Sequence, residues 1–148
     1  MKISESLKSI GIDLNKVIFV RHALSDRECH EAYVDGLLEE YQAMQKPLTD
    51  NKPVFSPGSI LVSFVSGEGT LAVFYGCYEV LAYSENTEDF MPKSFTSKHY
   101  FDGTGHYFTL RKLPYLNDQF EKLTIEWGGG VSSWYNYYKN GVDKEIIN

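Results

Sequence analysis

The sequence has few cysteines, no long apolar run and no excess of basic residues. It contains only two cysteines, Cys29 and Cys77, which are too few for a secreted disulfide scaffold. No apolar stretch approaches the ~20 residues that a membrane-spanning helix needs, and the N-terminus shows no signal-peptide pattern. We therefore expect a cytoplasmic protein.

Basic residues are outnumbered, 14 against 20 acidic ones, so the net charge is −6. This balance argues against a protein that binds polyanions non-specifically, because such proteins usually carry a basic excess. The charges are unevenly spread, however. Between residues 91 and 113 the basic side chains are Lys93, Lys98, Arg111 and Lys112, and the acidic one is Asp102. The sequence thus predicts a locally basic segment in an acidic domain.

The usual signatures of catalysis, metal binding and cofactor binding are also missing. The histidines and cysteines form no HxxxH, HxH or CxxC pair, and no GxSxG occurs. Gly67-Glu68-Gly69 joins two predicted strands, whereas a phosphate-binding loop must open a helix. Glycines 128–130 precede a predicted helix and could offer backbone N–H groups to an anion, but a flexible turn between a strand and a helix is the favoured explanation. We expect no catalysis by this chain, no metal and no cofactor.

The pattern of apolar residues predicts one α+β domain over residues 1–148, with helices mainly in the N-terminal third. A helix capped by Asp26 is expected to run to Val34, and a buried strand to end at Arg21-His22. Long hairpins without βαβ alternation favour a curved antiparallel sheet or a small PUA-like β-barrel. The other expected elements are helices at 4–10, 37–45 and 134–139 (capped by Ser132), and strands at 59–65, 70–83 with a bend at Gly76, 98–101, 106–113, 123–127 and 142–147.

Aromatic residues are abundant: 11 Tyr, 9 Phe and 2 Trp. Rings alternate with cations in the predicted hairpin over residues 98–113, and a second cluster runs from Trp127 to Tyr138. Rings that stack on bases, flanked by cations that hold phosphates, are typical of nucleic-acid-binding surfaces. The alternative interpretation is that half of these rings belong to the core and that the cations only solvate the other face.

Several short motifs occur in the following order: Val20-Arg21-His22, Glu40-Tyr41-Gln42, residues 74–80, residues 123–128 and Ser133-Trp134. Together they resemble the N-terminal domain that precedes the nuclease module in bacterial GIY-YIG nuclease family proteins. The family usually has Arg where this chain has Ser132, and neither a GIY nor a YIG tripeptide occurs here, so no nuclease module is present. The resemblance implies target recognition beside a DNA-cutting module, in cis or in trans.

We therefore expect a DNA-binding specificity domain of a restriction or defence nuclease. By analogy with PUA-like and SRA readers of modified bases, it would bind double-stranded DNA, including modified DNA, through an aromatic pocket. A protein-interaction or small-ligand-binding module remains an alternative, which the acidic segment Glu28–Glu40 suits, and an enzyme is a third. The expected ligand-binding residues are Trp127, Trp134, Tyr135 and Tyr107; the expected phosphate-binding residues are Arg21, Lys98, Arg111 and Lys112.

Overall fold

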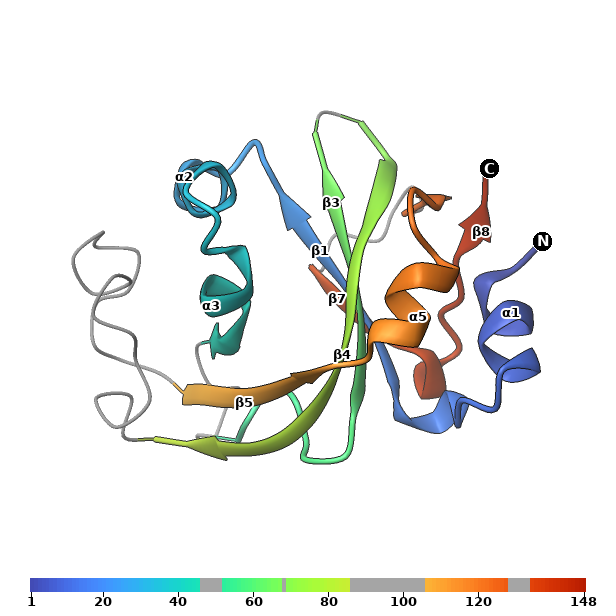
Figure 1. Ribbon diagram of the computed structural model, residues 1–148, viewed down its shortest axis with the longest axis horizontal. Coiled ribbons are helices and arrows are strands. Elements are labelled where there is room, and N and C mark those ends of the chain that lie inside the picture. Colours follow the sequence, from blue (N-terminus) through green and yellow to red (C-terminus); the bar gives the residue numbers. More distant parts are fainter. Residues whose placement is uncertain (46–51, 68, 86–105, 128–133) are drawn as a thin grey trace.

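The computed structural model describes residues 1–45, 52–67, 69–85, 106–127 and 134–148. These residues form an α+β fold in which one curled sheet carries a few short helices (Figure 1). Its helices are α1 (Ile3–Ser9), α2 (Arg27–Val34), α3 (Leu38–Ala43) and α5 (Pro114–Gln119), with 3-10 turns η1 (Leu14–Lys16) and η4 (Tyr138–Asn140). Its strands are β1 (Val17–Ala23), β2 (Met44–Gln45), β3 (Ile60–Ser66), β4 (Leu71–Ser84), β5 (His106–Lys112), β6 (Thr124–Glu126), β7 (Tyr135–Tyr137) and β8 (Glu145–Ile146).

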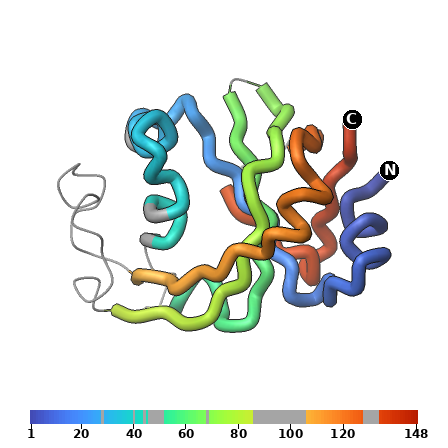
Figure 2. The backbone as a smooth tube through the Cα atoms, viewed as in Figure 1, coloured from blue at the N-terminus to red at the C-terminus, as the bar shows by residue number. Residues whose placement is uncertain are grey.

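The sheet follows the order β2-β5-β4-β3-β1-β7; off this path, the short strand β6 pairs with β4, and β8 pairs with β6. The 14 residues of β4 pair with β3 on one side and with both β5 and β6 on the other, so this strand holds the sheet together. Helices α2 and α3 lie at one end of the molecule, and α1 and α5 lie at the other, near both termini (Figure 2). The expected curved sheet and early helices are confirmed.

The expectation of a purely antiparallel sheet is wrong. Strands β1 and β3 run parallel, from Val17 opposite Ile60 to Ala23 opposite Ser66, and the chain crosses between them through α2 and α3. The sheet is therefore mixed. The sequence hides this connection because α2 and α3 span only 8 and 6 residues, so no long helical pattern separates the two strands.

Side chains from the two faces of β1 enter two different cores. Phe19 belongs to a cluster under α1 and α5, whereas Ile18 and Val20 belong to a cluster on the opposite face with Phe108. A strand buried on both faces is a continuous apolar run, which is why the sequence predicts it correctly. Cys77 is fully buried in the first cluster, as expected of a small core residue.

The bend predicted in β4 coincides with a real irregularity. The pairing of β3 with β4 shifts register between Ser63 and Phe64, opposite Gly76. A Cβ atom at Gly76 would lie 2.6 Å from the hydroxyl oxygen of Tyr78, whose ring is almost fully buried. Glycine is needed here because another side chain occupies the space of its missing Cβ.

The predicted helix over residues 134–139 is wrong. Tyr135–Tyr137 is strand β7, which pairs antiparallel with β1, and a 3-10 turn follows it. The i, i+4 spacing of Trp134 and Tyr138 suggested a shared helix face, but the two rings pack on different cores. Pairing with a buried strand outweighs this weak helical pattern, and the aromatic residues themselves favour a strand.

Three predicted features lie outside the described residues. They are the hairpin partner 98–101 of β5, the glycine turn at 128–130 and the cap Ser132. Strand β5 itself pairs with β4 and β2. None of the helices formed by the described residues has the length and apolar character needed to cross a membrane.

Candidate functional site: a pocket at the carboxyl end of β1

A pocket of about 280 Å³ opens where β1 ends and α2 begins. Ligands of sheets with helical crossovers bind outside the carboxyl ends of the strands, because the loops that leave those ends converge there. Four separate stretches of sequence contribute to the pocket. Its lining residues are Arg21, His22, Ala23, Asp26, Cys29, Tyr41, Gln45 and Trp134.

Arg21 is the cation that lines this pocket. Its guanidinium carbon lies 5.4 Å from the ring centroid of Trp127, close enough for a cation–π contact. The Nε–H of Arg21 is buried and has no hydrogen-bond partner in the described part of the chain. A buried donor without a partner loses free energy, about 1–3 kcal/mol, unless a ligand or water accepts its hydrogen bond. The Trp127 ring therefore holds the Arg21 side chain in place, and the Arg21 Nε–H is buried against the protein.

Lys144 contacts the same Trp127 ring as Arg21 does. Its Nζ lies 3.5 Å from the centroid of the Trp127 ring, and it donates hydrogen bonds to the Trp127 carbonyl (2.9 Å) and to Asn136 Oδ1 (2.7 Å). Burial lowers the pKa of Lys144 to about 8, the charge of Arg21 acts in the same direction, and Asp143 opposes both. Lys144 thus ties the end of β6 to β7 and positions the ring on which Arg21 rests.

His22 provides a neutral group beside Arg21. It is 4% exposed, and its Nε2 lies 2.7 Å from Gln42 Oε1, which also accepts a hydrogen bond from the Ser63 hydroxyl. Burial lowers the pKa of His22 to about 4, and the hydrogen bond to Gln42 offsets only part of this effect. Because Gln42 Oε1 accepts, Nε2 carries the proton and Nδ1 is left as an acceptor. Nδ1 makes no hydrogen bond with the described residues.

Asp26 is the acidic residue of the pocket and also the N-cap of α2. Its Oδ1 accepts a hydrogen bond from the backbone N–H of Cys29 at 3.0 Å, as the sequence predicts. The thiol of Cys29 is buried, and burial together with the charge of Asp26 raises its pKa to about 11. A thiol with so high a pKa is not a nucleophile at neutral pH.

Trp134 forms the aromatic wall. The backbone N–H of Arg21 donates to the Trp134 carbonyl at 2.8 Å, which places the two residues side by side. The Trp134 ring packs edge to face against Tyr135 (centroids 4.7 Å apart) and Phe55 (5.9 Å). Two aromatic neighbours fix the ring, while its half-buried position leaves part of its surface open to the pocket.

The structure brings together only part of the predicted site. Arg21 and Trp134 line the pocket, whereas Trp127 is 1% exposed and lies beneath Arg21, and Tyr135 supports Trp134 from behind. Tyr107 pairs with Met44 and Ser84 and is not part of the lining.

The predicted phosphate-binding cations lie elsewhere. Arg111 forms an ion pair with Glu79, and Lys112 Nζ lies 2.8 Å from Glu39 Oε1. Lys98 lies outside the described residues. Of the predicted phosphate-binding set, Arg21 alone lines the pocket.

The site also contains residues that sequence reasoning did not assign to it. The sequence indicates a helix cap at Asp26, and it marks His22, Tyr41 and Gln42 as members of short motifs without predicting that they share a site. A signal was present, since polar residues that directly follow a buried strand mark the edge of a sheet where ligands bind. Without the parallel crossover, nothing linked Arg21-His22 to Tyr41-Gln42.

A second hollow, of about 360 Å³, lies between α3, β4 and α5 and has Tyr75 and Tyr78 on its floor. Its Lys112 already pairs with Glu39, and none of the buried polar atoms that lack a partner belongs to its lining. The first pocket is the better candidate because an aromatic ring, a buried neutral histidine and an acidic side chain line it together. Within the described ranges, no group of three His, Cys, Asp or Glu side chains is placed to hold a metal ion.

Comparison with protein-family models, with curated proteins and with solved structures finds no match to this chain. The family resemblance therefore rests on its motifs alone.

Proposed function

We propose that the chain is a DNA-recognition domain that holds one base of the DNA in the pocket at the end of β1. It would have no catalysis of its own and would direct a nuclease module in cis or in trans. The pocket carries this proposal: Arg21, a neutral histidine and a tryptophan wall are among the residues that line about 280 Å³. Ligand pockets usually measure about 300–1,000 Å³, so this one suits a single small ring system.

The convergence of the motifs supports the proposal. Arg21-His22, Tyr41 and Trp134 come from separate motifs of the family resemblance, and all of them line one pocket. Gln42, from the second motif, hydrogen-bonds to His22. We further propose that the curled sheet is of the PUA-like kind, in which a base would be received at the rim. The unpaired thiols of Cys29 and Cys77 fit a reducing compartment, and we place the protein in the cytoplasm.

Phosphate contacts would come from Arg111 and Lys112. Both side chains are more than half exposed, and their ion pairs lie at the surface, where such pairs contribute about 0–1 kcal/mol. A DNA phosphate can therefore replace the glutamate partner at little cost. Because phosphate contacts are local, the overall charge of −6 does not exclude them.

Replacement of Arg111 or Lys112 by Ala should weaken binding to every duplex alike and reduce the slope of log affinity against log salt by about one. Affinity is measured by fluorescence anisotropy at several salt concentrations. The matched control is Lys8→Ala, on the distant helix α1, which should change neither quantity. Unchanged slopes in both test variants would remove these residues from the DNA interface.

The pocket is tested with duplexes that contain unmodified, methylated, hydroxymethylated or glucosylated bases. Arg21→Ala and Trp134→Ala should lower affinity for the preferred duplex at least tenfold, because they remove the positive charge that lines the pocket and the stacking wall. Arg27→Ala is the control, since this exposed arginine pairs with Glu31 and does not line the pocket. No binding to any duplex at low salt would contradict the proposal.

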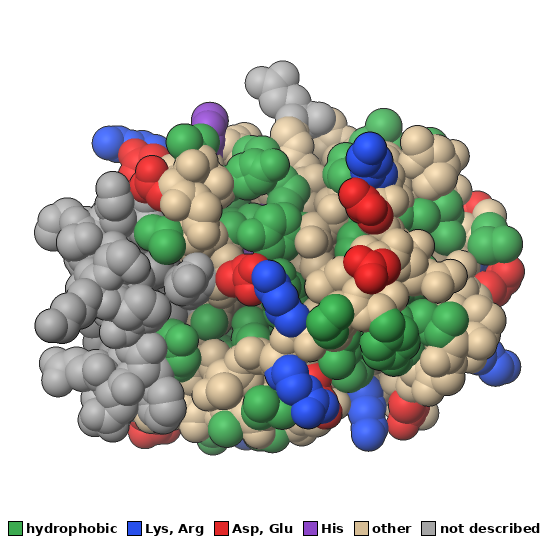
Figure 3. Space-filling model, in the orientation of Figure 1, with side chains coloured by type: hydrophobic (Ala, Val, Ile, Leu, Met, Phe, Trp, Pro, Cys, Tyr) green, Lys and Arg blue, Asp and Glu red, His purple; other side chains and the backbone are tan. Residues whose placement is uncertain are grey.

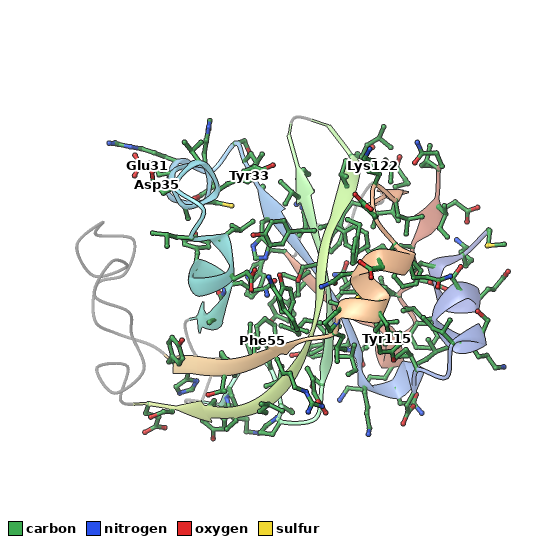
Figure 4. All side chains as sticks on the ribbon, in the orientation of Figure 1. Glu31, Tyr33, Asp35, Phe55, Tyr115 and Lys122 are labelled. Carbon is green, nitrogen blue, oxygen red and sulfur yellow. The ribbon has the colours of Figure 1, made fainter. Side chains whose placement is uncertain are left out.

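A second candidate function, protein interaction, is favoured by one surface. Glu31 and Asp35 lie on the outer side of α2, and Tyr33 lies on the side toward the sheet (Figure 4). Hydrophobic side chains gather on the surface beside this helix (Figure 3), and Val34 is 71% exposed. If this surface binds a protein neighbour, Tyr33→Ser with Val34→Ser should abolish co-purification and leave duplex affinity unchanged.

A further inference from the structure

Arg21 and His22 are neighbours on β1, and their side chains leave the strand on opposite faces. The Arg21 guanidinium lies on the ring of Trp127, which belongs to the core cluster under α1 and α5. His22 lies on the other face, where it contacts Gln42. The interior of the pocket therefore takes its polar atoms from His22 and its neighbours, and Arg21 contributes its charge from the other side of β1.

His22 presents a hydrogen-bond acceptor to the pocket. Its Nε2 donates to Gln42 Oε1, which leaves Nδ1 unprotonated. Nδ1 makes no hydrogen bond within the described ranges, yet it is not one of the buried polar atoms that lack a partner. It therefore borders open space, and His22 lines this pocket. Because His22 is only 4% exposed, the pocket is where a ligand can reach this atom.

Gln45 presents a second acceptor. Its Nε2 donates to the backbone carbonyls of Tyr41 (3.5 Å) and Gln42 (2.9 Å), so the amide oxygen is turned away from them. No hydrogen bond to Gln45 Oε1 exists in the described part of the chain. Gln42 thus holds both lining side chains, His22 through its side-chain oxygen and Gln45 through its backbone oxygen. Both acceptors are neutral and fixed in orientation.

Asp26, the acid of the lining, is an acceptor as well. It is exposed to solvent and adds a negative charge. A ligand carbonyl or phosphate oxygen would therefore meet other acceptors, whereas an amine would meet groups that accept its hydrogen bonds. A carbonyl that displaces water from the nearly buried Nδ1 of His22 leaves this atom without a donor, which is costly.

DNA bases differ in this respect. Adenine, cytosine and guanine carry an exocyclic amine, which donates two N–H groups, and thymine carries carbonyls with one N–H between them. We infer that the pocket selects a base with an exocyclic amine, which donates to His22 Nδ1 and Gln45 Oε1 while Trp134 stacks on the ring. The inference rests on the proposed function, which makes DNA the source of the base. The same chemistry would recognise a free amino-bearing nucleoside.

Two pairs of bases test this selection, because each pair differs mainly in an amine replaced by a carbonyl: cytosine with uracil, and adenine with hypoxanthine. Calorimetry measures the four free nucleosides, and anisotropy measures four duplexes that each carry one of these bases unpaired. In the format that binds, the amino base of each pair should bind at least tenfold more tightly than its carbonyl counterpart. No binding in either format contradicts both the inference and the proposed function.

Gln45→Met removes one acceptor at nearly constant size and should reduce the preference severalfold. Its matched control is Gln119→Met, at an exposed position of α5 outside the pocket, which should preserve the preference. An unchanged preference in Gln45→Met overturns the role assigned to Gln45. His22 is tested in the intact chain by nitrogen NMR, in which Nδ1 should resonate as an unprotonated nitrogen and shift when the amino nucleoside binds. A protonated Nδ1 overturns the inference.

The two formats separate the inference from the proposed function. Duplex binding with equal affinity for both members of a pair overturns the inference and leaves the proposed function standing. Preference among free nucleosides without duplex binding does the reverse.

Discussion

At the scale of single residues, the buried polar groups around the pocket decide what it can bind. His22 is kept neutral by burial, and its hydrogen bond to Gln42 Oε1 sets which nitrogen carries the proton. Gln42 is itself 1% exposed, and its Nε2 has no partner among the described residues. This network fixes the position of the His22 ring and leaves Nδ1 as its acceptor without adding charge.

His22 predicts an acid-sensitive component of stability. The folded state holds the pKa of His22 near 4, below its ordinary value of 6.5, so the unfolded chain binds a proton that the folded chain does not. Stability should fall as pH drops from 6.5 to 4, by roughly 3 kcal/mol. Urea unfolding at several pH values measures this slope. His22→Leu should show a flatter slope from a lower starting stability, and the exposed His30→Gln should follow the parent chain.

Lys144 predicts a change of stability at alkaline pH, whereas His22 predicts one at acidic pH. The pKa of Lys144 is about 8 in the folded chain, below its ordinary value of 10.5. Between these pH values the unfolded chain holds a proton that the folded chain has lost, so stability should rise with pH. The neutral amine keeps its hydrogen bonds to Trp127 and Asn136. Lys144→Met leaves both acceptors unpaired, which should cost about 2–4 kcal/mol at pH 7. It should also remove the rise seen at pH 9.5.

Urea midpoints at pH 7 and pH 9.5 check this prediction, with the exposed Lys8→Met as the control. If the parent chain and Lys144→Met show the same change between the two pH values, Lys144 keeps an ordinary pKa. The account of the cation pair around Trp127 would then be wrong.

At the scale of elements, the pocket depends on how β1 and α2 are joined, and the curl of the sheet depends on β4. Asp26 starts α2 directly after β1 ends, so the cap that begins the helix also supplies the acidic group of the pocket. The bend at Gly76 lets β4 reach both β5 and β6, which keeps the sheet curled. The helix cap at Asp26 and the bend at Gly76 are therefore local features of the sequence that help to position groups far apart in the chain.

Gly76→Ala should destabilise the fold by about 1–3 kcal/mol, because its Cβ would lie 2.6 Å from Tyr78 Oη in a tightly packed core. Thermal and urea unfolding measure the loss. Gly67→Ala is a matched control, since a Cβ there meets no atom within 4 Å and its φ is not left-handed. In a Tyr78→Phe background the cost should shrink but persist, because the ring carbon Cζ still lies 2.9 Å away. Equal stability of Gly67→Ala and Gly76→Ala would contradict the steric explanation.

At the scale of the whole molecule, the sequence predicts what depends on local pattern. The doubly buried run of β1, the Asp26 cap of α2 and the bend at Gly76 all follow from residue type and spacing. The parallel pairing of β1 with β3 does not, because strand direction leaves no mark on an apolar run. That one connection decides which residues share the pocket.

The candidate site was predictable only in part for the same reason. Arg21 and Trp134 can be recognised as candidate binding residues by their residue type, and both line the pocket. Trp127 is of the same type, but its ring is buried in the core. Arg111 and Lys112 look like free cations in the sequence, but Glu79 and Glu39 reach them across the fold. These contacts join residues more than 30 positions apart, which periodicity cannot reveal.

The central claim is that a DNA base enters the pocket beside Trp134, and the chain's two tryptophans allow a direct test. Trp127→Phe leaves Trp134 as the fluorophore, and Trp134→Phe leaves the buried Trp127. On titration with the preferred duplex, stacking should quench the fluorescence of Trp127→Phe strongly and that of Trp134→Phe little, with anisotropy confirming that both variants bind. Bound duplex with equal quenching in the two variants, or with none in Trp127→Phe, would contradict the account.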